Sequence, residues 1–215
     1  MKRLLTGLSF AATLTCTLPP QALAVKPINF AGGYVIMNEY SYNGKMLHMY
    51  YSPSATFSFG LDTEWMEKDD NEYTSYIART NYLLKRWNMP EAQANVYFNI
   101  GLGVAEDDNN TKFAAKSGIM ADYETRRFLV SYENKAYHAT DIDNHFEQSV
   151  RAGFAPYVGE YGDLHTWFMI QADHHPTNDD QFVITPLVRM YYGTALWEAG
   201  YSSNNNLFVS LNCQF

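Results

Sequence analysis

The chain has 215 residues, with 23 acidic and 15 basic residues and a formal net charge of −8. An acidic chain without a basic stripe argues against nucleic acid as a partner. Its 17 tyrosines, 13 phenylalanines and 4 tryptophans contrast with a charged fraction of only 18%. The length suits one domain, and no Pro/Ser-rich linker divides it.

The first 24 residues have the pattern of a secretory signal peptide. Lys2 and Arg3 are positive, residues 4–18 are apolar, and the Ala-Leu-Ala sequence at 22–24 fits a cleavage site. We therefore expect residues 1–24 to be removed and residues 25–215 to form the mature domain. Loss of the two basic residues takes the net charge from −8 to −10. Cys213 is then the only cysteine, which excludes an internal disulfide.

Turn residues divide the mature sequence into twelve segments of roughly ten residues, the spacing of an all-β protein. The segments run near 28–38, 45–52, 55–66, 73–87, 92–104, 112–125, 127–137, 145–157, 164–174, 181–192, 194–202 and 206–215. Two of them, 45–52 and 194–202, are short, which leaves ten strands as an alternative. Pro186 lies within a segment and predicts a bulge there.

The connections between these segments are of two alternating kinds. Polar, mostly acidic loops such as KDDNEY, EDDNNT and HHPTNDD follow the odd segments, and short turns such as SPS and NMPE follow most even ones. Transmembrane barrels have an even number of strands, short periplasmic turns and longer polar loops outside. The alternation therefore predicts an antiparallel barrel with two different ends.

Apolar and polar residues also alternate within the segments. In AQANVYFNIGLGV, the alanine, valine, phenylalanine, isoleucine and leucine at 94–102 share one face, and polar residues dominate the other. A soluble sandwich shows the same alternation. Aromatic residues near strand ends, the signal peptide and a last strand that ends on Phe215 favour a membrane barrel.

With its signal peptide, its hairpin rhythm and its final strand LFVSLNCQF, the chain resembles bacterial outer-membrane β-barrel proteins, among them the small monomeric porin-like group. The resemblance implies a closed antiparallel up-and-down transmembrane β-barrel of about 12 strands. It implies the outer membrane of a Gram-negative bacterium, with lipid around the barrel and both termini toward the periplasm. It also implies that Phe215 is the assembly signal for the barrel-insertion machinery.

Strand parity predicts which charged side chains face the lumen. They are Asp62, Glu64, Arg79, Lys85, Lys116, Asp122, Glu133, Glu147, Arg151, Asp173, Arg189 and Glu198. In one interpretation they line a narrow channel for small polar solutes or ions and set its selectivity. In the other, opposite charges pair and close the lumen. The chain is then a structural or surface-interaction barrel, whose acidic loops bind cations or partners.

His174, His175, Asp179 and Asp180 form the most metal-like cluster. Adjacent residues of a strand point to opposite faces, and the spacing matches no zinc signature. We therefore predict a polar loop there, with no metal and no cofactor. A rim-located outer-membrane enzyme is a third alternative. The lipid-degrading barrels often carry His-x-Ser on one strand, and no histidine in this chain is followed by serine two residues later.

Overall fold

A computed structural model describes residues 26–68, 71–108, 110–160, 162–177 and 181–215. The predicted signal peptide, residues 1–24, lies outside the described residues. Among the described residues, no helix combines the length and apolar character needed to span a membrane.

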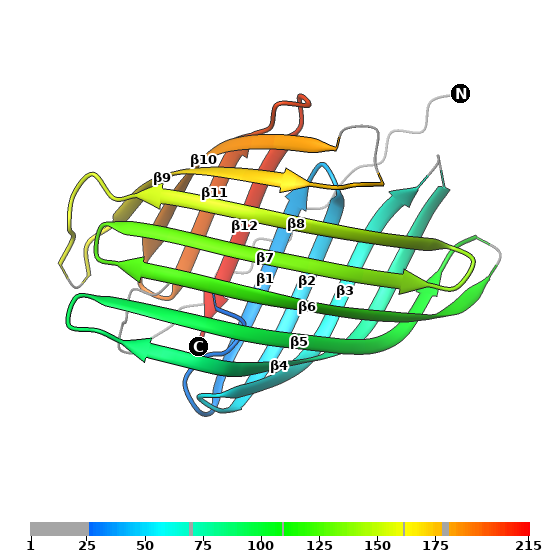
Figure 1. The fold of residues 1–215 in the computed structure, drawn as a ribbon, viewed down its shortest axis with the longest axis horizontal. Coiled ribbons are helices and arrows are strands. Elements are labelled where there is room, and N and C mark those ends of the chain that lie inside the picture. The colour runs from blue at the N-terminus through cyan, green and yellow to red at the C-terminus, as the bar shows by residue number, and fades with distance from the viewer. Residues whose placement is uncertain (1–25, 69–70, 109, 161, 178–180) are drawn as a thin grey trace.

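The described residues form twelve antiparallel strands in one closed barrel (Figure 1). The strands are β1 (Gly33–Ser41), β2 (Gly44–Ser54), β3 (Phe57–Lys68), β4 (Asn71–Asn88), β5 (Ala92–Glu106), β6 (Thr111–Thr125), β7 (Phe128–Ala139), β8 (Asp143–Phe154), β9 (His165–His174), β10 (Phe182–Tyr192), β11 (Ala195–Tyr201) and β12 (Leu207–Gln214). Each strand pairs with its chain neighbours, and β1 pairs with β12 to close the ring. The predicted closed barrel of about twelve strands is confirmed, and the ten-strand alternative is wrong.

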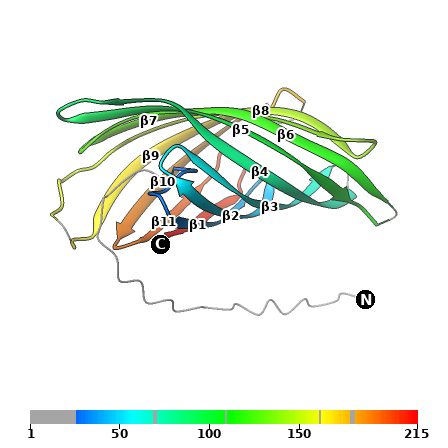
Figure 2. The same ribbon diagram turned by 90° about the horizontal axis from the view of Figure 1, so that it is seen from below.

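The barrel is flattened into two layers (Figure 2). Strands β5–β8 lie on one broad face, and β1–β3 with β11 lie on the other. The connections from each odd strand to the following even strand gather at one end, which we call the loop end. The connections from each even strand to the following odd strand gather at the other end, which we call the turn end.

The outer surface of the barrel is apolar. On β5, Ile100 and Leu102 are 45% and 57% exposed, whereas Asn95, Tyr97 and Asn99 are buried. The same alternation runs through the other strands. Because the sheet closes on itself, no strand edge is left unpaired, and an apolar outer face of this kind suits lipid.

One bulge reverses the predicted parity near the turn end of β4. The β4–β5 register shifts between Leu83 and Lys85, and an extra residue moves the side chains that follow to the opposite face. Lys85 consequently lies on the outer face, with its Nζ 5.9 Å from the centroid of the Trp87 ring. The prediction that Lys85 faces the lumen is therefore wrong. Arg86 faces inward instead, and its Nε donates a hydrogen bond to Asn95 Oδ1 at 2.7 Å.

The bulge predicted at Pro186 is absent from the described β9–β10 ladder, where Pro186 pairs with Ile170 in unbroken register. Two residues earlier, the backbone of Ile184 exchanges hydrogen bonds with Ser203 on the β11 side. The backbone N–H and C=O groups of residues two apart in a strand point toward the same neighbouring strand. The backbone of Pro186 therefore also points toward β11. The β10–β11 pairing stops at Leu187 and Gly200, and the hydrogen bonds of Ile184 with Ser203 lie in the same register, so the missing N–H of Pro186 leaves a gap in this ladder without a bulge.

We expect Ile100→Arg, in the middle of the apolar outer face, to destabilise the folded barrel in lipid vesicles by about 2–4 kcal/mol. Met89→Arg is the control, because Met89 lies in the β4–β5 turn and a charge near the interface costs about 0–1 kcal/mol. Urea-dependent folding into vesicles measures both variants. Equal effects of the two substitutions would contradict a lipid-facing surface on β5.

Candidate functional site

The barrel encloses a cavity of about 1060 Å³ with charged walls. At the loop end its lining includes Tyr42, Asn43 and His175. It continues past charged residues on the strands and reaches Pro27, which precedes β1 and lies toward the turn end. The cavity therefore extends along much of the inside of the barrel.

Eleven of the twelve predicted lumen residues face inward, and Lys85 is the exception described above. Asp62, Glu64, Arg79, Lys116, Asp122, Asp173, Arg189 and Glu198 are buried. Glu133, Glu147 and Arg151 are more open, and all three line the cavity. Parity counting found these positions because every inward residue of a strand is two residues from the next.

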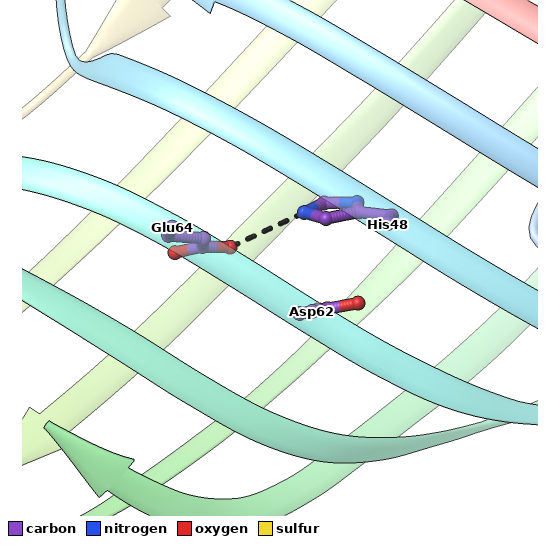
Figure 3. A group of neighbouring side chains, drawn as sticks. All are labelled: His48, Asp62 and Glu64. Carbon is purple, nitrogen blue, oxygen red and sulfur yellow. Dashed lines mark ion pairs between the residues drawn. The ribbon is translucent and has the colours of Figure 1, made fainter.

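Two carboxylates of β3 form the centre of a buried charge network. Asp62 and Glu64 are both fully buried, and His48 of β2 lies beside them (Figure 3). Arg79 Nη1 donates to Asp62 Oδ2 at 2.9 Å. Lys116 of β6 forms ion pairs with both acids, with its Nζ 3.2 Å from Asp62 Oδ2.

Further groups complete this network. His48 Nε2 lies 3.4 Å from Glu64 Oε1 (Figure 3), and Lys135 Nζ of β7 lies 3.9 Å from Glu64 Oε2. The Tyr50 hydroxyl donates a hydrogen bond to Asp62. A buried charge is tolerated when a partner compensates it. The network therefore joins β3 to β6 and β7, which are not its neighbours in the sheet.

His48, Asp62 and Glu64 offer ligand atoms within 4.8 Å of one another, close enough to hold a metal ion. The Lys116 ammonium already contacts both carboxylates. A divalent cation here would have to displace this lysine and would meet its positive charge. The arrangement therefore fits a charge network better than a metal centre.

The two histidines of the metal-like cluster predicted near the end of β9 lie in different surroundings. His174 stacks on Phe182 with ring centroids 4.3 Å apart, and its Nδ1 is 2.9 Å from Gln148 Nε2. His175 is instead buried at the cavity wall. Asp179 and Asp180 lie outside the described residues.

A second charge network lies on the wall formed by β8–β11. Arg189 Nε donates to Glu198 Oε1 at 2.7 Å, and Arg151 Nη1 donates to the same oxygen at 3.0 Å. Arg151 also donates to Gln171, whose amide in turn donates to Asp173 at 2.9 Å. The two arginines here are thus held by one glutamate and by neighbouring polar groups.

A contact across the loop end joins distant parts of the chain. Tyr42, between β1 and β2, hydrogen-bonds His175 Nε2, and His175 Nδ1 lies 3.4 Å from Glu147 Oε2. Burial lowers the pKa of His175, against the opposing effect of Glu147 and Asp173. Burial likewise raises the pKa of the Tyr42 hydroxyl. Both side chains are therefore neutral near pH 7, and nothing in the sequence pattern indicated this contact.

The residues before β1 enter the turn end of the barrel. Lys26 and Ile28 are only 3% and 4% exposed. Lys26 Nζ donates to Gln93 Oε1 at 2.6 Å, and its pKa is lowered by burial. Ser58 Oγ donates to the Pro27 carbonyl at 2.6 Å. This N-terminal segment, residues 26–29, thus fills part of the turn end. The first strand was predicted to begin near residue 28, so this segment inside the turn end was not predicted.

The inner wall also contains apolar side chains. Leu129, Met169, Leu187 and Phe208 form a buried cluster on β7, β9, β10 and β12. Leu129 and Phe208 line the cavity as well. The inner face is therefore less uniformly polar than the alternation in the sequence suggested.

No protein-family model matches the chain, and the search of curated proteins gives no match. Among solved structures, the chain is similar to the KdgM porin at 12% sequence identity and a TM-score of 0.47, covering 85% of this chain and 98% of that one. It is similar to OccK8 (OprE) of Pseudomonas aeruginosa at 7% identity and a TM-score of 0.44, covering 80% of this chain and 57% of that one.

A loop-deletion mutant of OmpT, an outer membrane protein of Vibrio cholerae, is similar at 10% identity and a TM-score of 0.31, covering 87% of this chain and 98% of that one. At such identities the likeness concerns the barrel fold and says nothing about the contents of the lumen.

We expect Lys116→Met to destabilise the folded protein by about 3–5 kcal/mol, because two buried carboxylates lose their shared partner. Lys112→Met on the same strand is the control. Its ion pair with Asp141 is exposed, with side-chain exposures of 35% and 75%, and exposed pairs contribute about 0–1 kcal/mol. Urea unfolding in vesicles compares the two, and similar midpoints would mean that the central network contributes little.

Proposed function

We propose that this protein is an outer-membrane β-barrel that forms a narrow channel for small polar solutes or ions. One observation carries the proposal: a charged cavity of about 1060 Å³ lies inside a closed barrel whose outer face is apolar. A lipid-facing outside and a polar inside are the two requirements for a passage through a membrane. The proposal includes export, removal of residues 1–24 and a monomer in the outer membrane.

The C-terminal residue lies at the closing seam of the barrel. Phe215 and Tyr34 exchange backbone hydrogen bonds, both at 2.9 Å, next to the β1–β12 ladder. The pairing of β12 with β1 closes the ring, which makes this strand a suitable place for a recognition signal. We include in the proposal that Phe215 is read by the insertion machinery.

A closed structural or surface-interaction barrel is the second candidate. It is supported by the central network, in which Lys116 and Arg79 occupy the lumen beside two acids. The channel is the better explanation because the cavity continues past this network, from Tyr42 at the loop end to Pro27. A catalytic role for Tyr42 beside His175 is disfavoured, since a tyrosine with a raised pKa is a poor nucleophile.

The test is single-channel recording of the refolded protein in a planar bilayer. Folding is checked first by the heat-dependent shift of its band on a gel. We expect discrete current steps. A correctly folded protein that gives no steps would overturn the channel and support the closed barrel.

The N-terminal segment provides a further prediction. Because Lys26 is held inside the turn end by Gln93 and by Glu124, 3.7 Å away, we expect the segment to restrict passage. Lys26→Ala should therefore increase the single-channel conductance or the time spent open. Arg126→Ala is the control, because Arg126 is exposed in the β6–β7 turn at the same end. Equal conductance of the two variants and the native protein would show that the segment does not limit passage.

A further inference from the structure

The charged residues of the cavity wall are predominantly acidic. Eleven aspartates and glutamates line the cavity, against six lysines and arginines. The acids are Glu39, Glu67, Glu72, Glu106, Asp107, Asp108, Asp122, Glu133, Glu147, Asp173 and Glu198, and the bases are Lys45, Arg79, Lys116, Lys135, Arg151 and Arg189. The excess of acids means that a solute entering from the loop end meets a negative potential along the wall.

Most of the basic groups of the wall are already compensated. Among the residues that the structure describes, five of the six, all except Lys45, form ion pairs with lumen carboxylates. The carboxylates that hold them belong to Asp62, Glu64, Glu147 and Glu198. A guanidinium or ammonium group held in this way attracts a passing anion far less than an unpaired one does.

Two glutamates of the wall stand outside these pairs. Within the part of the chain that the structure describes, neither Glu39 nor Glu133 forms a hydrogen bond or an ion pair, although both line the cavity. Glu39 belongs to β1 and Glu133 to β7, which lie six strands apart in a ring of twelve and thus on opposite walls. Figure 2 shows these two strands on the two broad faces of the barrel.

The two carboxylates influence each other electrostatically, and Arg151, Glu198 and Lys135 also act on Glu39, with Arg151 the strongest of these neighbours. Glu133, whose side chain is exposed to the cavity, therefore places negative charge on the passage, whereas burial disfavours the charged form of Glu39 on the opposite wall. A ring or pair of carboxylates facing a narrow lumen is a common basis of cation selectivity, because it lowers the barrier for cations and raises it for anions. The low-dielectric barrel wall strengthens this effect.

From these observations we infer that the lumen selects small cations over anions, and that Glu133 and the acidic excess of the wall set this preference. The inference rests on the proposed channel function and adds the class of solute to it. Neutral polar solutes remain compatible with such a lumen, whereas anionic solutes meet Glu133 and the acidic loop end.

The experiment is a reversal-potential measurement in planar bilayers with a KCl gradient, at low salt, where screening is weak. We expect the current through the native protein to reverse at a potential nearer to the equilibrium potential of K⁺ than to that of Cl⁻. Glu133→Gln should lower the K⁺/Cl⁻ permeability ratio by roughly twofold to fivefold, the effect of one charge at a distance of about 5 Å in screened water, and Glu39→Gln should lower it less. The double substitution should lower it further.

Glu91→Gln is the matched control, because Glu91 is exposed in the β4–β5 turn and is not among the residues that line the cavity. It should leave the ratio unchanged. Channels that prefer chloride, or a ratio that the two lumen substitutions do not alter, would overturn the inference and leave the channel proposal intact. Absence of current steps from a folded protein would overturn both. A shifted gel band on heating confirms that each variant has folded.

Discussion

Charge compensation inside the closed sheet is the constraint on which the rest of this structure depends. Asp62 and Glu64 are fully buried, and an unpaired buried carboxylate costs several kcal/mol. Their partners include Lys116 of β6 and Lys135 of β7, two strands that are not adjacent to β3. The sheet can therefore close and flatten only in an arrangement that brings these strands together, and the same arrangement leaves the cavity beside the network.

The two ends of the barrel are held by different chemistry. At the loop end, a neutral tyrosine–histidine contact joins the β1–β2 connection to the end of β9. At the turn end, the buried ammonium of Lys26 holds the N-terminal segment against β5 and β6. Neither contact is made within a hairpin, so both depend on the closed ring to bring their partners near.

Much of the fold was predictable because strand geometry leaves few choices. A period of two residues fixes which side chains share a face, and alternate turn lengths fix the two ends. Eleven of the twelve predicted lumen residues followed from this rule alone. Lys85 did not, because a bulge reverses parity and the sequence near Leu83 has no feature that marks one.

Other functional residues were missed for separate physical reasons. The first strand was predicted near 28–38 but spans Gly33–Ser41, which placed Glu39 in a loop instead of on the cavity wall. Gly32, with φ of +88°, ends the preceding turn in a backbone region that a strand residue does not adopt. The contacts of Lys26 and His175 join residues far apart in sequence, and local patterns contain no information about such pairs.

The central claim is that a water-filled lumen lies inside a lipid-facing shell, and neighbouring residues of β7 test it directly. Ser131 lines the cavity, and Val130 faces outward with 50% exposure. In a Cys213→Ser background, Ser131→Cys and Val130→Cys would each be treated in sealed vesicles with a membrane-impermeant, positively charged thiol reagent. The account predicts rapid labelling at position 131 and none at 130. Equal labelling at both positions, or labelling at 130 alone, would contradict it.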